Sequence, residues 1–223
     1  MSELPLASLL LWGTIVGLDL ASVLQGLLNR PLVAGAVAGV IIGDPAAGLR
    51  IGAALELFAL DVLPVGASRY PDYGAATVAA VALGAWQPWA AALGPAVLLG
   101  LVLAQIGGLT VVAHRRANAW ALHRAAAALD RGDPGVAGRL HLLGLGADLL
   151  RSASLAALGL GAVVLLTHSP RFDLGTGQAL TVVTVAGGFV ALISGALRRA
   201  GTARRIAWLA GGILLGVVGL AVL

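Results

Sequence analysis

The sequence predicts an all-α, polytopic membrane protein: a helical bundle with short re-entrant or broken helices in its N-terminal third. Hydrophobic residues make up 59% of the 223 positions and charged residues only 11%, whereas soluble domains carry roughly 25% charged residues. A soluble core of this size cannot bury so much apolar surface, but a bilayer accommodates it. The length favours a single domain over residues 1–223.

The first apolar segment, residues 6–28, is predicted to cross the membrane, because about 20 residues span the hydrocarbon. It contains Asp19 and Gln25, so we do not expect it to face only lipid. Asn29-Arg30-Pro31 ends the segment. A proline disfavours helix at the residue before it and suits the first turn of a new helix.

The next apolar segments are too short or too broken to be ordinary spans. They cover residues 32–43, 48–63 and 74–86. A helix of 12 residues reaches about 18 Å, well short of a hydrocarbon core of about 30 Å. Irregular backbone at membrane depth is tolerated only inside protein or along a cavity. Transporters build binding sites from such breaks, so this stretch is the first place to look for a site.

The second half of the chain alternates apolar and basic stretches. Its predicted spans are residues 90–113, 142–166, 178–197 and 206–223. Between the first two, residues 114–141 carry five Arg against two Asp, a bias typical of cytoplasmic connections. We expect a surface helix over 116–129 and a turn over 132–135 there. A second Arg cluster, at 198–205, falls on the same side after two more spans, as that rule requires.

Composition also limits the chemistry. All 14 basic residues are Arg and lie mostly between apolar segments, where membrane topology explains them and nucleic acid is not expected. The chain has no Cys, which excludes disulfides, thiolate metal sites and a phosphocysteine. Its four His show no metal-binding spacing, and it has neither a Walker-type phosphate loop nor a nucleophile elbow. We therefore expect no catalytic residue, metal or cofactor on this chain.

Charged residues inside apolar segments are costly unless paired or hydrated. Glu56 lies in the middle of such a segment and is a functional-site candidate by default. Asp61 and Arg50 are explained equally well by headgroup water at segment ends. Carboxylates and amides suit the paired hydroxyls of a sugar, yet a proton- or cation-coupled carrier needs the same groups, and composition does not separate the two.

One further pair of charges lies in the second half of the chain. Asp148 and Arg151 are three residues apart and so share a helix face. The favoured interpretation is a self-neutralising pair near the cytoplasmic end of its segment, with a role in substrate binding as the alternative.

An ordered series of short motifs runs through the first third: Asn29-Arg30-Pro31-Leu32, Gly39-x-x-x-Gly43-Asp44, Gly48, Gly52-x-x-x-Glu56-x-x-Ala59-Leu60, Gly66-Ala67 and Pro71-Asp72. In this order and spacing it resembles the membrane IIC subunit of the mannose/fructose/sorbose-type phosphotransferase system. The resemblance is clear over about residues 5–115 and looser beyond, where 141–153 and 186–188 look like family positions.

The resemblance implies a sugar permease subunit in the bacterial cytoplasmic (inner) membrane. Such a subunit binds a hexose and works with a second membrane subunit, IID. Cytoplasmic IIA and IIB subunits relay phosphate, and IIB, which carries the phosphohistidine, phosphorylates the sugar. The resemblance leaves a homo-oligomer open. Its implied sugar-binding residues are Glu56 and Asp72 first, then Asn29, Asp44 and Gln25.

Two departures from the family pattern sustain other hypotheses. The chain is short for the family, and Arg69 and Tyr70 stand where the family often has small residues, so that Arg69 narrows the site or binds an anion. A stand-alone facilitator, or a regulatory membrane protein without phosphate coupling, is the main alternative. An unrelated cation-coupled carrier that uses Asp19 and Glu56 is the third hypothesis.

Overall fold

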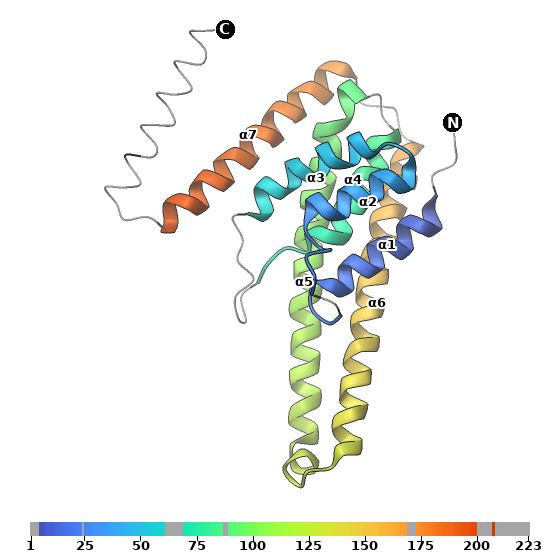
Figure 1. Cartoon of the computed structure of the whole chain (residues 1–223), viewed down its shortest axis with the longest axis vertical. Coiled ribbons are helices and arrows are strands. Elements are labelled where there is room, and N and C mark those ends of the chain that lie inside the picture. Colours follow the sequence, from blue (N-terminus) through green and yellow to red (C-terminus); the bar gives the residue numbers. More distant parts are fainter. Residues whose placement is uncertain are drawn as a thin grey trace.

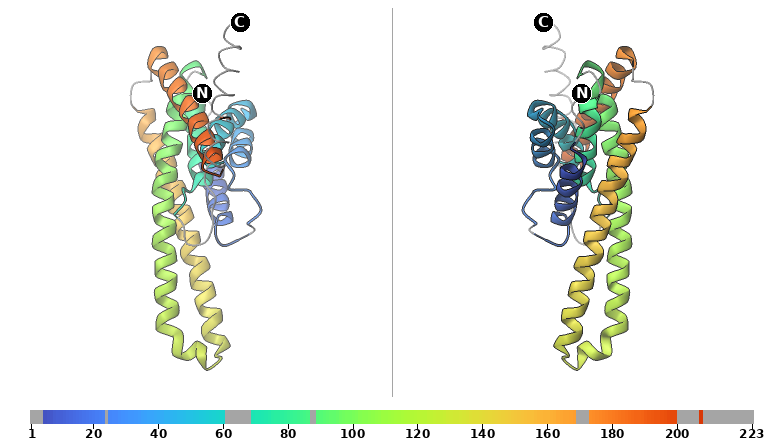
Figure 2. Two further views of the ribbon diagram at one scale, coloured as in Figure 1. Left: turned by 90° about the vertical axis from the view of Figure 1, so that its left-hand side faces the viewer. Right: turned by 90° about the vertical axis from the view of Figure 1, so that its right-hand side faces the viewer.

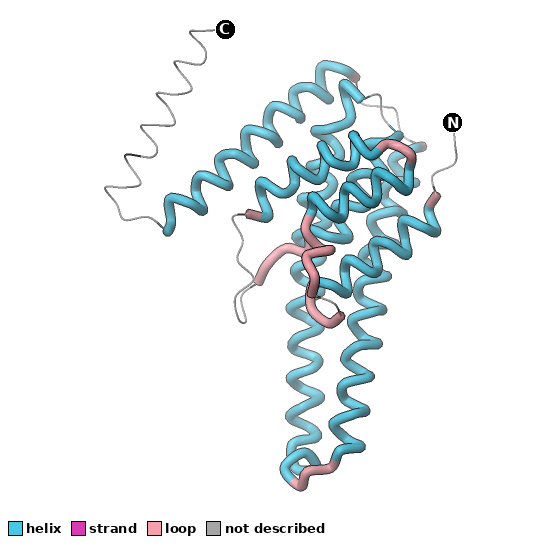
Figure 3. The backbone as a smooth tube through the Cα atoms, in the orientation of Figure 1, coloured by secondary structure: helices cyan, strands magenta, loops and turns pink. Residues whose placement is uncertain are grey.

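The computed structural model describes residues 5–23, 25–60, 69–86, 89–168, 173–199 and 207. These residues form helices joined by loops, with no strand among them (Figures 1 and 3). The predicted all-α class is therefore confirmed. The helices are α1 (Leu6–Asp19), α2 (Pro31–Ile42), α3 (Pro45–Ala59), α4 (Tyr73–Trp86), α5 (Trp89–Asp130), α6 (Pro134–Thr167) and α7 (Leu174–Arg199).

The helices divide into long and short ones, as the apolar pattern predicts. Three of the described helices, α5, α6 and α7, are long and apolar enough to cross a membrane. The shorter α1 to α4 pack beside one half of the α5–α6 pair, and α7 packs against α3 and α5 (Figures 1 and 2). The combination of spans with short, broken helices in the N-terminal third is confirmed.

The core is built around α4. Every residue of this helix except its last two is buried, and the helix contacts α1, α2, α3, α5 and α6. A helix enclosed on all sides must be apolar all round. Small side chains, mainly Ala, let its neighbours approach closely. Its Thr77 satisfies its own hydroxyl within the helix, donating to the Tyr73 carbonyl at 2.7 Å.

The prediction of a single span over residues 6–28 is wrong, because α1 ends at Asp19. The Asp19 carboxylate accepts backbone N–H groups from Gly26 at 2.7 Å and Asn29 at 3.0 Å, which folds the chain back on the helix end. Gln25 and Leu27 adopt positive φ angles of 49° and 70°, uncommon for residues with a side chain. Both residues lie in the loop that folds the chain back after α1.

The predicted separate surface helix over 116–129 is also wrong, because α5 runs without interruption to Asp130. At 1.5 Å per residue its 42 residues extend about 63 Å, twice the thickness of the hydrocarbon. The predicted turn at 132–135 is confirmed in its first half, since α6 begins at Pro134 and Asp133 caps it by accepting from Gly135 and Val136. The C-terminal half of α5 and the N-terminal half of α6 thus form a projecting hairpin (Figure 2).

Helices α2 and α3 form a close antiparallel pair, joined by a turn at Gly43 and Asp44. Gly43 has φ of 82°, a conformation that glycine adopts without strain. A Cβ atom on Gly48 of α3 would lie 2.3 Å from the Gly35 carbonyl oxygen and 2.7 Å from the Gly39 Cα. The motif glycines therefore let the two backbones touch, a device common between membrane helices.

Some expectations concern residues whose structure is not described. Asp61, the Gly66-Ala67 motif, Arg204 and Arg205 lie outside the described residues, as does the predicted span over 206–223 apart from residue 207.

The contact between α2 and α3 predicts that Gly48→Ala destabilises the protein. The added methyl group meets backbone atoms, so the helices must separate, at a cost of about 1–3 kcal/mol. Thermal denaturation of the purified chain in detergent measures the effect. Gly161→Ala is the matched control, because nothing lies within 4 Å of the Cβ position there. Equal melting temperatures for the two variants would contradict the prediction.

Candidate functional site

A polar cavity of about 510 Å³ lies where the loop after α1, the segment before α4 and the middle of α5 meet. Figure 3 shows these loops beside α5. Its polar lining residues are Asp19, Ser22, Gln25, Asn29, Tyr70, His114, Arg115 and Asn118. A smaller pocket of about 50 Å³ shares Leu20, Asn29 and Tyr70 with it and reaches Arg30 and Pro71. The two together form the candidate site.

Two of the predicted binding residues, Gln25 and Asn29, line this cavity. Their backbone is held by Asp19, which is only 2% exposed and accepts the N–H groups of Gly26 and Asn29. The Gln25 amide donates to the Ala21 carbonyl at 2.9 Å. Asp19 therefore fixes the loop that presents both carboxamides to the cavity.

Glu56 does not line either pocket but binds residues at the start of α2. Its carboxylate forms an ion pair with Arg30 and accepts the backbone N–H of Leu32 at 3.1 Å. The first N–H groups of a helix have no partner within that helix, and here a carboxylate from α3 supplies one. Arg30 in turn lines the smaller pocket. Glu56 therefore acts on the site indirectly, by holding Arg30.

Asp44 lies at the opposite end of the α2–α3 pair. Its side chain caps α3 by accepting the Ala47 N–H at 2.9 Å. The 12 residues of α2 separate it from Asn29 by about 18 Å. The structure thus does not bring Asp44 together with the other predicted site residues.

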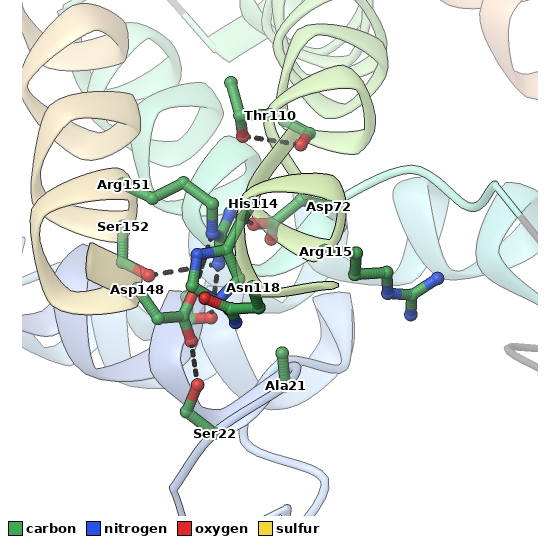
Figure 4. A network of polar contacts seen from close by, with 12 residues as sticks. Ala21, Ser22, Asp72, Thr110, His114, Arg115, Asn118, Asp148, Arg151 and Ser152 are labelled. Atoms are coloured by element: carbon green, nitrogen blue, oxygen red, sulfur yellow. Dashed lines mark hydrogen bonds and ion pairs between the residues drawn. The ribbon is translucent and has the colours of Figure 1, made fainter. Parts of the chain in front are cut away.

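Asp72 belongs to a buried ionic cluster with Arg151 and Asp148 (Figure 4). Arg151 donates to Asp72 at 2.8 Å and to Asp148 at 2.6 Å. It also donates to the Gly17 carbonyl at 2.9 Å, and Ser22 donates to Asp148. The predicted pairing of Asp148 with Arg151 is confirmed, but the pair is not self-contained, because Arg151 bridges it to Asp72.

This cluster fixes two walls of the cavity without lining it. Asp72 is fully buried and its N–H donates to the Ala104 carbonyl of α5 at 2.9 Å, which anchors the segment that carries Tyr70. Ser22, on the other wall, is held through Asp148. One oxygen of Asp72 has no hydrogen-bond partner in the described part of the chain.

Tyr70 and Arg115 form the wall nearest α5. The Arg115 guanidinium lies 4.8 Å from the centre of the Tyr70 ring and donates to its hydroxyl. Tyr70 is 8% exposed. Arg69 is exposed and is not among the residues that line the cavity. Of the two bulky residues that depart from the family pattern, Tyr70 is therefore the one that shapes the site.

Sequence reasoning missed the contribution of α5. His114, Arg115 and Asn118 line the cavity, although the polar pattern assigned them to a connection outside the membrane. His114 and Asn118, four residues apart, share a helix face, and the Asn118 amide lies 3.0 Å from the His114 ring nitrogen. The Arg115 side chain leaves α5 on another side (Figure 4). The signal was available in the helix-favouring sequence that continues from 113 into 116–129.

The described chain is thus a multi-pass helical membrane protein with a polar cavity built at the breaks between its helices. A sequence profile described as "PTS system sorbose-specific IIC component" matches residues 5–197. The chain belongs to the sorbose-type IIC family of the phosphotransferase system, as the motif series indicates.

Individual relatives agree with this family. The chain is 33% identical over 126 residues to the fructose permease IIC component of Bacillus subtilis (strain 168), which covers 56% of this chain and 45% of the relative. It is 30% identical over 154 residues to the sorbose-specific EIIC component of Klebsiella pneumoniae, covering 69% and 56%. The curated relatives that it matches are longer, and the chain spans between 26% and 56% of their length.

Solved structures share the fold. The cryoEM structure of the mannose transporter ManYZ in complex with microcin E492 contains a chain that superposes with a TM-score of 0.61 at 22% identity, covering 100% of this chain and 94% of that one. A second structure, titled "Structure of membrane protein", superposes with a TM-score of 0.69 at 22% identity over the same shares.

The buried cluster predicts that Arg151→Gln strongly destabilises the protein. The change leaves two buried carboxylates without their cation, which costs about 3–5 kcal/mol. Combining it with Asp72→Asn and Asp148→Asn removes those charges and restores much of the loss. Thermal denaturation in detergent compares the variants, with Arg139→Gln on the exposed surface of the projecting hairpin as control. A triple variant no more stable than Arg151→Gln alone would refute the assignment.

Proposed function

We propose that this chain is the sugar permease (IIC) subunit of a mannose-type phosphoenolpyruvate-dependent phosphotransferase system in the bacterial cytoplasmic membrane. It binds a hexose and moves it inward for phosphorylation by IIB. The family match over residues 5–197 carries this proposal. The polar cavity at the helix breaks supports it with a place for the sugar.

The chemistry of the cavity suits a neutral, hydroxyl-rich ligand. Carboxamides of Gln25, Asn29 and Asn118 offer both donors and acceptors, and Ser22 adds a hydroxyl. The Tyr70 ring supplies an apolar face with a polar edge. When a bound sugar covers such groups they discriminate between sugars, because a missing hydroxyl leaves one of them unpaired.

We assign two kinds of role to the residues of the proposed site. Gln25 and Asn29 contact the sugar directly, since both line the cavity. Glu56 positions Asn29 by holding Arg30 and the start of α2. Asp72 positions Tyr70 through the Arg151 cluster, and Asp44 sets the α2–α3 pair by capping α3.

The proposal includes partners that supply what this chain lacks. No catalytic residue is assigned here; the phosphoryl carrier belongs to IIB, which IIA supplies, and a IID subunit completes the membrane part. The shared fold with a chain of the solved ManYZ transporter supports a membrane partner of this kind. Apolar side chains along α7, including Val182, Val183 and Val190, are exposed and offer surface to lipid or to that partner.

Uptake measurements in membrane vesicles test the function. Labelled mannose, fructose and sorbose are offered to vesicles that contain this chain with IID, IIA, IIB and phosphoenolpyruvate. We expect one of them to accumulate as its phosphate, and omission of any partner to abolish accumulation. Accumulation of free sugar without partners would instead support the stand-alone facilitator, and dependence on sodium or pH alone would support the cation-coupled carrier.

Glu56→Gln is expected to lower the rate of coupled uptake at least roughly tenfold, because loss of a hydrogen-bonded ion pair costs about 1.5–3 kcal/mol. Arg30 loses its partner and the start of α2 loses a charged acceptor. Asp133→Asn serves as the control, since Asn replaces Asp well as a helix cap and the position lies at the hairpin tip. Unchanged uptake by Glu56→Gln at equal protein levels would remove Glu56 from the proposed site.

A further inference from the structure

The two walls of the cavity differ in charge. The wall formed by the loop after α1 presents Ser22, Gln25 and Asn29, which are neutral. The opposite wall, on α5, presents Arg115 with His114 and Asn118. Asp19 also borders the cavity, but its two oxygens accept backbone N–H groups and it is 2% exposed. A ligand in the cavity thus meets hydroxyl-binding groups on one side and a cation on the other.

The cation in this wall, Arg115, is held in place by other side chains. Arg115 is half-buried and lines the cavity, and the Tyr70 ring and hydroxyl hold its guanidinium in place. Tyr70 is itself almost fully buried, in a segment anchored by the Asp72–Arg151 ion pair. Asn118 and His114, which are one helical turn apart, contact each other at 3.0 Å. Figure 4 shows His114 and Asn118 on the side of α5 nearest the buried cluster, and the Arg115 side chain directed away from it.

The His114 and Asn118 part of this wall also borders a second groove. A larger groove of about 700 Å³ runs between α5 and α6 in the projecting hairpin and shares Ala21, Ser22, His114 and Asn118 with the cavity. The Arg content of residues 114–141 predicts that this hairpin is cytoplasmic. A sugar that leaves the cavity in that direction passes His114 and Asn118.

We propose that Arg115, held by Tyr70, forms a subsite for the phosphoryl group of a sugar phosphate, so that the cavity binds the phosphorylated product as well as the free sugar. This rests on the proposed permease function. A phosphoryl group carries a charge of about −1.5 to −2 and three strong acceptor oxygens. A guanidinium matches it with paired hydrogen bonds. Phosphoryl transfer itself remains with IIB.

Calorimetric titration of the purified full chain in neutral detergent tests the subsite. The probes are the hexose found in the uptake experiment, its phosphate, and inorganic phosphate. We expect the wild type to bind the sugar phosphate more tightly than the sugar. Arg115→Gln should weaken sugar phosphate binding roughly 10- to 100-fold, the value of a charge-assisted hydrogen bond of about 1.5–3 kcal/mol, and change sugar binding less than about twofold.

Two matched variants make the result specific. Arg116→Gln removes the neighbouring charge, which is exposed and does not line the cavity, and should change neither affinity. Arg115→Lys keeps the charge but loses the paired geometry, and should fall between the wild type and Arg115→Gln. Equal weakening of sugar and sugar phosphate by Arg115→Gln would show that the residue only supports the fold and would overturn the subsite.

Other outcomes also overturn the proposal and identify the source of the anion. Inorganic phosphate binding as tightly as the sugar phosphate, with the same dependence on Arg115, would define a site for free phosphate. Competition by phosphatidylglycerol in mixed micelles that disappears in Arg115→Gln would define a lipid headgroup site. Failure of the permease function is distinct, because sugar uptake and sugar binding would then be absent in the wild type as well.

Discussion

Helices that stop inside an apolar body leave backbone N–H groups without partners, and in this chain carboxylates from the predicted stretch accept them. Asp19 takes two N–H groups of the loop after α1, Glu56 takes one at the start of α2, and Asp44 takes one at the start of α3. Carboxylates are costly inside a membrane, but here they stabilise the helix breaks that create the cavity. The same residues explain the short helices and the polar site.

The buried cluster around Arg151 links elements that are far apart in the sequence. Its partners come from α1, from the segment before α4 and from α6, elements that adjacent motifs alone do not hold together. Such ion pairs add little net stability compared with apolar packing, but removing one partner is costly. The cluster therefore acts chiefly to select one arrangement of the loops around the cavity, with Tyr70 on one wall and Ser22 on the other.

The sequence was informative where the relevant physics is local. Proline and glycine breaks, segment lengths and the motif series predicted α2, α3, α4 and the family. The sequence did not predict features that depend on contacts between residues far apart in the chain. Nothing in the apolar run over residues 6–28 announces that Asp19 will bind N–H groups seven and ten residues away. The Asp72–Arg151 bridge joins residues 79 apart. The end of α5 differs from the prediction for another reason: the charges of residues 114–141 are typical of a connection, whereas their Ala-rich sequence favours continued helix.

The projecting hairpin of α5 and α6 has a practical consequence for imaging. A 22.2 kDa membrane protein in a detergent micelle normally gives particle images with few features to align. Two continuous helices that leave the bundle together give the molecule a recognisable direction (Figure 2). The tight connection at residues 131–133 is an exposed tip of the kind that accepts inserted domains, so a rigid fusion grafted there would report the orientation of the whole bundle, including its cavity.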